Sequence, residues 1–208
     1  MRLVSAVYGS HYPFHNIEKF NEFVASDDPA DLREGDCLLV WGGSDIHPSL
    51  YGRSLSRFSG ASSSGPSQRD LVEWHLMLRA KELSLPIIGI CRGAQMLCAL
   101  AGGTLLQHVN GHGGDHMVVT RDGKEFQVNS LHHQMMYPTG TEHNIVAWSK
   151  HIRSDVHYDV DEPVPVDLEP EFIHFPSVKG FAVQWHPEMM NENSGATQYV
   201  NHFIVRHL

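Results

Sequence analysis

Short apolar runs separated by polar stretches mark the first half of the chain. Residues 3–8 and 37–41 are apolar runs that end next to glycine, and residues 86–90 (PIIGI) form a continuous apolar run. A run without polar alternation is typical of a strand that is buried on both faces of a parallel sheet. We therefore predict three strands in these segments.

Amphipathic stretches lie between and after these runs. Apolar positions at helical spacing predict one helix between the first two strands, a second over residues 68–83 and a third over residues 94–101. The small, polar segment 59–67 (SGASSSGPS) is expected to form a surface loop. The positions that set the helical spacing are Ile17, Phe20 and Val24 in the first stretch and Leu71, Trp74, His75 and Leu78 in the second.

The pattern changes in the second half of the chain. Residues 117–120 and 124–129 flank Asp122-Gly123, which is a hairpin signal and favours antiparallel pairing. Residues 172–175 and 181–185 are further strand candidates, whereas the rest of the proline- and acid-rich segment 155–176 predicts no definite path.

A C-terminal helix is expected after Asn193 or Ser194, either of which is a suitable N-cap. Alternating strands and helices with buried central strands predict an α/β fold. We expect a single-domain three-layer sandwich over residues 1–208 with a mostly parallel, mixed central sheet. The apolar face of the last helix comprises Ala196, Val200, Phe203, Ile204 and His207.

Composition and charge narrow the class of protein. The 208 residues are 41% hydrophobic and carry a formal net charge of −9, the profile of an ordinary globular domain. Net acidity without a run of Lys or Arg argues against nucleic-acid binding. We find neither a signal peptide nor an uninterrupted apolar stretch long enough to cross a membrane, so we expect a cytoplasmic protein with no membrane partner. The oligomeric state is left open.

The three cysteines differ in their surroundings. Cys37, Cys91 and Cys98 cannot all pair and show no CxxC spacing, which favours a reducing compartment. Cys37 and Cys98 lie on a predicted strand and a predicted helix, where we expect them to pack in the core. Cys91 instead lies in Gly89-Ile90-Cys91-Arg92-Gly93, where a buried strand meets a helix. This segment has the form of a nucleophile elbow, and the helix N-terminus favours a thiolate.

A cysteine nucleophile needs a base and a group that orients the base. His186 and Glu188 supply both at the end of a predicted strand, because alternation by two puts their side chains on one face of an extended chain. Each motif taken alone also fits a structural role, as a buried cysteine in a turn or as a strand-ending histidine beside a solvated acid. Together they predict a Cys-His-Glu triad.

Paired glycines end the second predicted strand. The backbone N–H of Gly43, together with that of Arg92, would form an oxyanion hole for a reacting carbonyl. Considered alone, the segment is typical of a strand-ending turn.

Histidines elsewhere suggest metal binding at first sight. His108, His112 and His116 recur every four residues, a spacing that would align three ligands on a helix. Glycines at 111, 113 and 114 disfavour that helix, so we predict no metal site. His132 and His133 fit a substrate pocket better than a ligand pair.

Five motifs together resemble one protein family. They are WGGSDIHPSLYG from Trp41, GICRGAQ around Cys91, GGTLLQH from Gly102, NSLHHQ from Asn129 and QWHPE around His186. They are similar to class I glutamine amidotransferase domains, and most to the stand-alone gamma-glutamyl hydrolase (gamma-glutamyl-GABA hydrolase-like) branch. In the α/β-hydrolases, by contrast, the acid precedes the histidine.

The resemblance implies a flavodoxin-like sandwich and a hydrolase that uses Cys91, His186 and Glu188 to cleave a gamma-glutamyl amide. The small-molecule substrate would be glutamine or a gamma-glutamyl amine, and no cofactor is implied. An alternative is a glutaminase subunit that delivers ammonia to a separate synthetase chain, and a third hypothesis is a non-catalytic binding protein. The implied substrate-binding residues are Gly43, Arg92, Gln95, Ser130, His133 and Gln134.

Two departures from the family pattern concern the substrate. Trp41 stands where members of this branch commonly have proline, which affects the predicted oxyanion loop. Residues 155–176 match no family motif and are a candidate for the wall that recognises the leaving amine.

Overall fold

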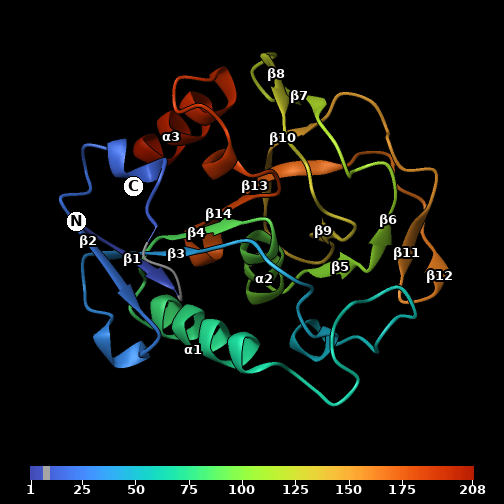
Figure 1. Ribbon diagram of the computed structural model, residues 1–208, viewed down its shortest axis with the longest axis horizontal. Coiled ribbons are helices and arrows are strands. Elements are labelled where there is room, and N and C mark those ends of the chain that lie inside the picture. The colour runs from blue at the N-terminus through green and yellow to red at the C-terminus, as the bar shows by residue number, and fades with distance from the viewer. Residues whose placement is uncertain (7–9) are drawn as a thin grey trace.

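The computed structural model describes residues 1–6 and 10–208, and its centre is a nine-stranded sheet (Figure 1). The strand order is β2-β1-β3-β4-β14-β13-β10-β7-β8. The strands β2, β1, β3, β4 and β14 are joined in parallel, and the remainder are joined antiparallel. The bounds are Arg2–Ala6 for β1, Glu22–Ser26 for β2, Asp36–Val40 for β3, Ile87–Ile90 for β4, His116–Thr120 for β7, Glu125–Val128 for β8, Asn144–Ser149 for β10, Pro170–Phe175 for β13 and Gly180–Val183 for β14.

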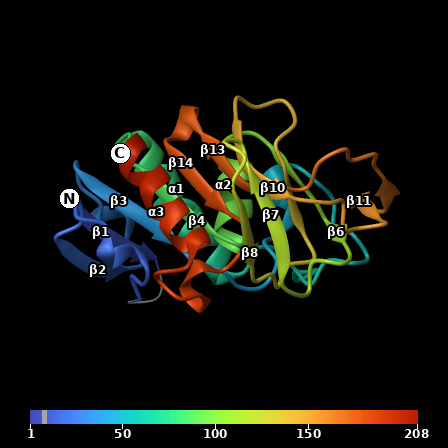
Figure 2. The same cartoon turned by 90° about the horizontal axis from the view of Figure 1, so that it is seen from above.

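Helices cover both faces of this sheet and produce three layers (Figure 2). Helices α1 (Gln68–Glu82) and α2 (Arg92–Leu100) contribute to one hydrophobic core, and α3 (Gly195–His207) contributes to the other. Strand β3 alternates between the cores: Leu38 packs on the side of α1 and α2, and Leu39 packs on the side of α3. Because successive side chains along a strand point to opposite faces of the sheet, one apolar run contributes side chains to both cores.

Short elements complete the chain. Strands β5 and β9 form a two-stranded sheet, and β6, β11 and β12 form a three-stranded one. Their bounds are Thr104–Leu106 for β5, His108–Val109 for β6, Met135–Tyr137 for β9, His157–Asp159 for β11 and Glu162–Pro163 for β12. Single 3-10 turns occur at Phe14–Asn16 (η1), Pro29–Asp31 (η2), Pro48–Tyr51 (η3), Pro176–Val178 (η4) and Pro187–Met189 (η5).

Most predicted elements are confirmed. The strands at 37–41, 86–90, 172–175 and 181–185, the hairpin at Asp122-Gly123 and the helices at 68–83 and 94–101 are present with shifted ends. The C-terminal helix begins after Ser194, whose side chain accepts a hydrogen bond from the Thr197 N–H. The first strand is confirmed as far as Ala6, because the end predicted for it at Tyr8 lies outside the described residues.

The helix predicted around Ile17, Phe20 and Val24 is wrong. Ile17 and Phe20 are buried in the core beside α3, but they lie between η1 and the strand β2, which contains Val24. Strand β2 pairs in parallel with β1 at the edge of the sheet. Ile17 and Phe20 therefore reach the core from the turn and the segment that follows it, and tertiary packing produces the spacing that suggested a helix.

The face predicted for α1 is also wrong. Leu71 and Leu78 are 40% and 38% exposed, whereas the buried face comprises Asp70, Glu73, Leu76, Met77 and Ala80. The helix turns two carboxylates inward because a buried arginine lies opposite them, as described below. The sheet was predicted to be mostly parallel, but every strand that follows β14 in the strand order is joined to its neighbours in antiparallel fashion. The antiparallel part of the sheet is therefore larger than predicted.

The helices are short or partly polar. Within residues 1–6 and 10–208, none of them combines the length and the apolar character that crossing a membrane requires.

Candidate active site

Cys91 occupies the sharp turn between β4 and α2. Its backbone has φ 49° and ψ −103°, a conformation that is rare for a residue with a side chain and that turns the thiol away from the strand. The backbone N–H of Cys91 donates to the carbonyl of Val183 on β14 at 2.7 Å, which anchors the turn to the neighbouring strand. The predicted nucleophile elbow thus has the expected geometry.

The two glycines of the elbow are required by close approach. A Cβ atom on Gly89 would lie 2.4 Å from the carbonyl oxygen of Gly93, and one on Gly93 would lie 2.2 Å from the carbonyl oxygen of Val40. Backbone atoms cannot give way as a flexible side chain can. Any larger residue would therefore force α2 away from β4 or β3.

The carboxyl ends of three neighbouring strands meet at this elbow. Strand β4 leads into Cys91, β3 leads into Trp41 and Gly42, and β14 leads through Gln184 and Trp185 to His186. The three strands are parallel and adjacent, so their carboxyl ends lie at the same edge of the sheet. Ligand sites of open α/β sheets lie at this edge.

His186 is held by both its backbone and its ring. Asn129 accepts a hydrogen bond from the His186 N–H and donates one to the His186 carbonyl, each at 2.9 Å. Nδ1 of the ring lies 2.7 Å from Oε1 of Glu188, which leaves Nε2 as the nitrogen that can exchange a proton with another group. Asn129 had no predicted role, although it opens the NSLHHQ motif.

The environment of His186 favours its charged form. Burial lowers the pKa of the imidazole, but hydrogen bonds with Cys91 and Glu188 and the negative charges of those groups outweigh burial and raise the pKa to about 10. An imidazolium beside Cys91 stabilises a thiolate, which is the reactive form of cysteine.

A pocket of about 460 Å³ opens above Cys91. Its walls include Cys91, His186 and Glu188, so all three predicted triad residues face one cavity. Leu131 and Met189 lie at its mouth and are 64% and 62% exposed, respectively. The other lining residues are Ser10, Trp41, Gly42 and Gly43.

The two predicted oxyanion donors come from different elements, the turn after β3 and the start of α2. Gly43 lines the pocket. Arg92 is the first residue of α2, where the backbone N–H has no acceptor within the helix. The side chain of Arg92 is buried away from the pocket, so its contribution to the predicted site is limited to the backbone.

The other predicted substrate-binding residues are not among those that line the pocket. The Gln95 amide donates to the carbonyl of Gln134 at 3.0 Å, and both residues are buried. The Ser130 hydroxyl donates to the carbonyl of His112 at 2.6 Å, and Nε2 of His133 lies 3.0 Å from Asp45. A substrate role for Gln95, Ser130, His133 and Gln134 stays a prediction.

A buried charge network supports the turn after β3. The guanidinium of Arg92 contacts Asp70 and Glu73 on the inward face of α1, and Glu73 also holds Nε of Arg69 at 2.9 Å. Arg69 in turn donates to the carbonyl of Gly42 at 2.9 Å. The network therefore connects the first residue of the elbow helix to the predicted oxyanion turn. Asp70 and Glu73 were not predicted, because helical spacing of apolar residues gives no sign of buried carboxylates.

The two other thiols are unsuited to nucleophilic chemistry. Cys37 and Cys98 are fully buried, and burial raises the pKa of Cys98 to about 12 and that of Cys37 further. Both pack in the hydrophobic cores as expected.

The candidate wall at residues 155–176 lies elsewhere. The segment forms β11, β12 and all of β13, and none of its residues is among those that line the pocket. Its path could not be predicted from the sequence, because β11 and β12 are very short and β11 pairs with β6, which lies far away in the chain.

The candidate metal histidines separate in space. His108 stacks on Phe58, whereas His112 and His116 lie against the buried carboxylate of Glu171. The segment between His108 and His116 is not helical, as its glycines indicated.

Comparison with known proteins finds one family model and several relatives that are similar to this chain. Residues 27–122 match the model of the Peptidase C26 family. A Schizosaccharomyces pombe protein that is named as a glutamine amidotransferase is 28% identical over 181 residues, which cover 82% of this chain and 69% of the relative. A Mycobacterium tuberculosis protein with the same family name is 30% identical over 172 residues. The matches show that this chain is similar to the Peptidase C26 family and to proteins named as glutamine amidotransferases. The second match covers 73% of this chain but only half of that glutamine amidotransferase.

Solved structures share the fold. A Thermoplasma acidophilum protein described as part of a GMP synthase has a TM-score of 0.65 and 14% identity, with 100% of this chain and 93% of that chain covered. A glutamine amidotransferase of Thermotoga maritima has a TM-score of 0.57 and 11% identity, covering 100% and 96%. At these identities the likeness concerns the fold alone, and it confirms the predicted α/β sandwich with a mixed sheet.

Proposed function

We propose that this chain is a cysteine hydrolase that cleaves the gamma-glutamyl amide bond of glutamine or of a gamma-glutamyl amine and releases glutamate. Such a substrate is a small molecule with an amide carbonyl at the end of a flexible chain, and the pocket above Cys91 is large enough to admit it. We also propose that the chain acts without a synthetase partner, like the stand-alone gamma-glutamyl hydrolases.

One observation carries the proposal. The thiol of Cys91 is held at a strained turn, Nδ1 of the His186 imidazole is held by Glu188, and the three side chains face one open pocket. A nucleophile, a base and a group that orients the base are the minimum set for acyl transfer.

The first half of the reaction would form a thioester. The Cys91 sulfur attacks the amide carbon with its proton held by His186, and the carbonyl oxygen becomes an oxyanion that the N–H groups of Gly43 and Arg92 stabilise. Collapse breaks the C–N bond, and His186 returns the proton to the leaving nitrogen, which departs as ammonia or an amine.

The second half would release glutamate. Water attacks the thioester carbon, His186 takes a proton from this water, and collapse breaks the C–S bond. The thiolate leaves and takes the proton back, which restores Cys91. Glu188 keeps Nδ1 of His186 protonated throughout, so that Nε2 exchanges the proton.

The direct test is release of glutamate and ammonia by the purified protein alone. The substrates are glutamine and a panel of gamma-glutamyl amides with small, long and apolar amines, and Cys91→Ala is the control. We expect turnover of at least one substrate that disappears in the control. Turnover that persists in Cys91→Ala, or turnover of none of the substrates, contradicts the stand-alone hydrolase.

A second candidate function is that of the glutaminase component of a synthetase. It is favoured by the fold shared with the Thermoplasma acidophilum protein described as part of a GMP synthase, which spans this whole chain. A component of this kind is expected to be almost silent alone yet to form the thioester with a reactive glutamine analogue. Silence in the substrate panel combined with alkylation of Cys91 would favour this second function.

A further inference from the structure

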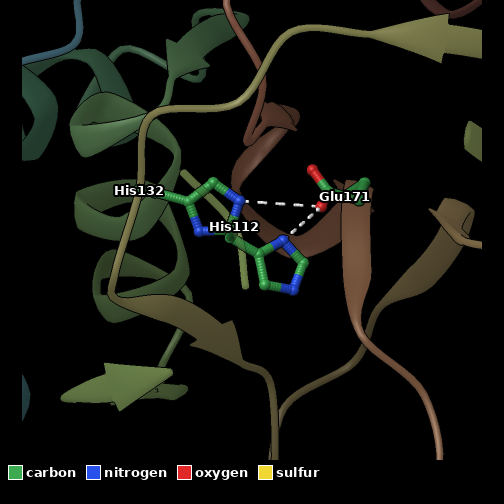
Figure 3. Close-up of side chains that lie close together, drawn as sticks. All are labelled: His112, His132 and Glu171. Carbon is green, nitrogen blue, oxygen red and sulfur yellow. Dashed lines mark ion pairs between the residues drawn. The ribbon is translucent and has the colours of Figure 1, made fainter. Parts of the chain in front are cut away.

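A second cluster of titratable side chains lies away from the pocket. His112, His132 and Glu171 are buried, and each offers one ligand atom within 4.8 Å of the others (Figure 3). Nδ1 of His112 lies 3.3 Å and Nε2 of His132 lies 3.6 Å from the same oxygen, Oε1 of Glu171. The three residues come from separate segments: the loop before β7, the loop before β9 and strand β13.

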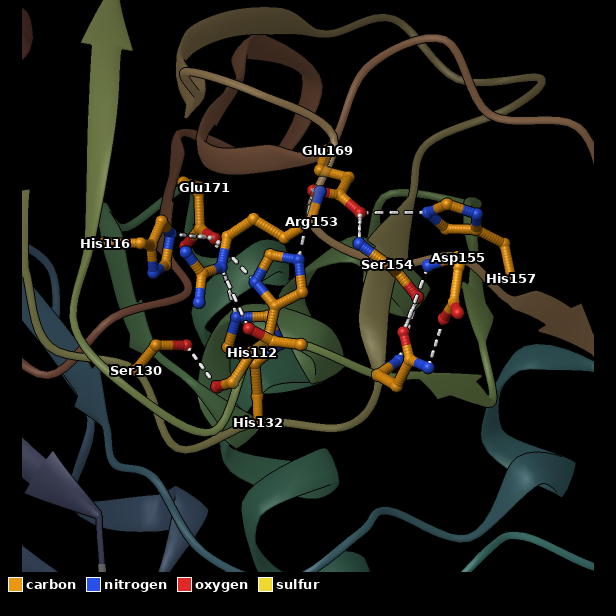
Figure 4. A network of polar contacts seen from close by, with 12 residues as sticks. His112, His116, Ser130, His132, Arg153, Ser154, Asp155, His157, Glu169 and Glu171 are labelled. Atoms are coloured by element: carbon orange, nitrogen blue, oxygen red, sulfur yellow. Dashed lines mark hydrogen bonds and ion pairs between the residues drawn. The ribbon is translucent and has the colours of Figure 1, made fainter.

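The other ring nitrogen of each histidine is already held. Nε2 of His112 lies 3.1 Å from Glu169 (Figure 4). Nδ1 of His132 lies 3.0 Å from the carbonyl of Gln134. Glu169 is itself fixed by the N–H groups of Arg153 and Ser154. Carboxylates and carbonyls in this outer position orient histidines that bind metal ions, because they fix the ring and the tautomer.

We propose that His112, His132 and Glu171 form a binding site for a divalent transition-metal ion, best suited to Zn²⁺, in which Nδ1 of His112, Nε2 of His132 and a carboxylate oxygen of Glu171 are the ligands. Two imidazoles and one carboxylate are a common zinc ligand set, and a fourth position stays open for water. The site is separate from the Cys91 pocket and departs from the sequence-based expectation of no metal site.

The spacing of the ligand atoms fits this ion. Ligands about 2.0 to 2.1 Å from a tetrahedral zinc lie about 3.3 Å from one another. The distances from Oε1 of Glu171 to His112 and His132, 3.3 and 3.6 Å, are close to this edge. Small side-chain shifts would bring the three atoms around one ion.

An ion pair of His112 with Glu169 and Glu171 explains the position of His112, but it does not explain why His132 faces the same carboxylate. In neutral His132, the proton on Nδ1 is donated to Gln134, so Nε2 presents a lone pair toward a carboxylate oxygen. Within the described part of the chain, Nε2 of His132 and Oε2 of Glu171 have no hydrogen-bond partner, although both are buried. Two facing acceptors repel each other, whereas a cation between them binds both.

His116 completes the outer shell and opens a route to solvent. Its Nε2 lies 2.9 Å from Oε1 of Glu171, where it can donate to the carboxylate. His116 also lines a surface pocket of about 400 Å³ with His151 and Arg153. An ion can therefore approach the buried carboxylate past His116.

A bound ion would connect segments that only weak local structure holds together. His132 lies three residues after Asn129, whose side chain holds the backbone of His186. Zinc would therefore stabilise the loop that positions the catalytic histidine, without contacting the reacting atoms. Its binding can be measured without any assay of catalysis.

The test is zinc binding by tag-free protein that has been stripped with a chelator. Calorimetry of the wild type should give one equivalent of zinc, and cobalt should give the intense visible absorption typical of a tetrahedral site. His132→Gln and Glu171→Gln should each lose more than the roughly 10- to 100-fold in affinity that the loss of an outer-shell partner causes. His133→Gln is the matched control, since His133 contacts Asp45 instead, and it should bind like the wild type.

Two outcomes would overturn the proposal. One is wild-type protein that binds less than one equivalent of zinc. The other is equal zinc affinity in the wild type, His132→Gln and Glu171→Gln, which would place any bound ion elsewhere. Circular dichroism identifies variants that fail to fold. If the ligand variants do not fold, the cobalt spectrum of the wild-type protein tests the site instead. A spectrum typical of octahedral cobalt would contradict the proposed site.

Discussion

Two histidine–carboxylate clusters lie on the two halves of the central sheet. In the parallel half, His186 and Glu188 accompany a thiol at a strained turn and face an open pocket. In the antiparallel half, His112 and His132 face Glu171 in the interior, without a nucleophile and away from that pocket. The same two residue types thus serve different chemistry: beside a thiol they can move a proton, and in a closed interior they can hold a cation.

The position in the sheet explains this difference. Parallel strands bring their carboxyl ends, and the loops that follow them, to one edge where a substrate can enter. Glu171 instead lies within strand β13, whose neighbours are antiparallel, and its side chain is buried. Variants that change one side chain in one of the clusters therefore test the catalytic role and the metal-binding role separately.

The largest expected effect follows from removing the nucleophile. Cys91→Ala should lower turnover by at least about 10³-fold, because general-base and oxyanion groups alone retain only a small part of the rate enhancement. Glutamate release measures this effect. Cys98→Ala is the matched control, since that thiol is buried in the core, and its turnover should persist. Equal losses in both variants would contradict the role of Cys91.

Neutralising the carboxylate of one cluster is expected to lower turnover less than loss of the nucleophile does, and neutralising that of the other is expected to weaken zinc binding. Glu188→Gln should lower kcat by about 10²- to 10⁴-fold, because the amide no longer fixes the His186 tautomer. Glu171→Gln should leave turnover of the folded enzyme in place and weaken zinc binding. Steady-state kinetics and calorimetry on both variants provide the comparison. If both variants lost activity alike, the two clusters would not be functionally distinct.

The network behind the elbow should affect stability. Glu73→Gln leaves the buried Arg92 with one fewer charged partner, which typically costs about 3 to 5 kcal/mol in the free energy of unfolding. Glu82→Gln breaks the exposed pair with Arg79 and should cost about 1 kcal/mol or less. Denaturant unfolding measures both. A similar small loss in the two variants would show that the buried network does not support the fold.

The smallest effect is a pH dependence. The pKa of His186 is raised to about 10 in the folded protein, against about 6.5 in an unfolded chain. The folded state therefore binds the proton more tightly, and the resulting stabilisation is complete below about pH 6.5 and is lost as the pH rises toward 10. The stability difference between the wild type and Glu188→Gln should shrink from pH 6.5 to 10. A constant difference would mean that Glu188 does not stabilise the imidazolium.

Local chemistry could be predicted from the sequence, and long-range pairing could not. The elbow around Cys91 and the contact between His186 and Glu188 are set by neighbouring residues and could be anticipated, although Glu188 lies in the 3-10 turn η5 and not in the extended chain that was expected. The inward face of α1 could not be anticipated, because Asp70 and Glu73 are buried against Arg92, which lies 22 and 19 residues later on another helix. Helical spacing at Ile17 and Phe20 was misleading for the same reason, since distant packing decides where these residues lie.

The buried cluster illustrates the same limit. His112, His132 and Glu171 belong to three segments, and the spacing of His108, His112 and His116 suggested a different set of ligands. Only the pairing of β13 with its neighbours brings Glu171 to the two loops.

The most direct measurement is covalent labelling with an electrophilic glutamine analogue, such as a diazoketone, followed by intact-mass analysis and peptide mapping. The account predicts one adduct per chain, on Cys91, which is prevented by excess gamma-glutamyl substrate and absent in Cys91→Ala. It also predicts no adduct on Cys37 or Cys98. Absence of labelling, or labelling that persists in Cys91→Ala, would contradict the assignment of Cys91 as the nucleophile.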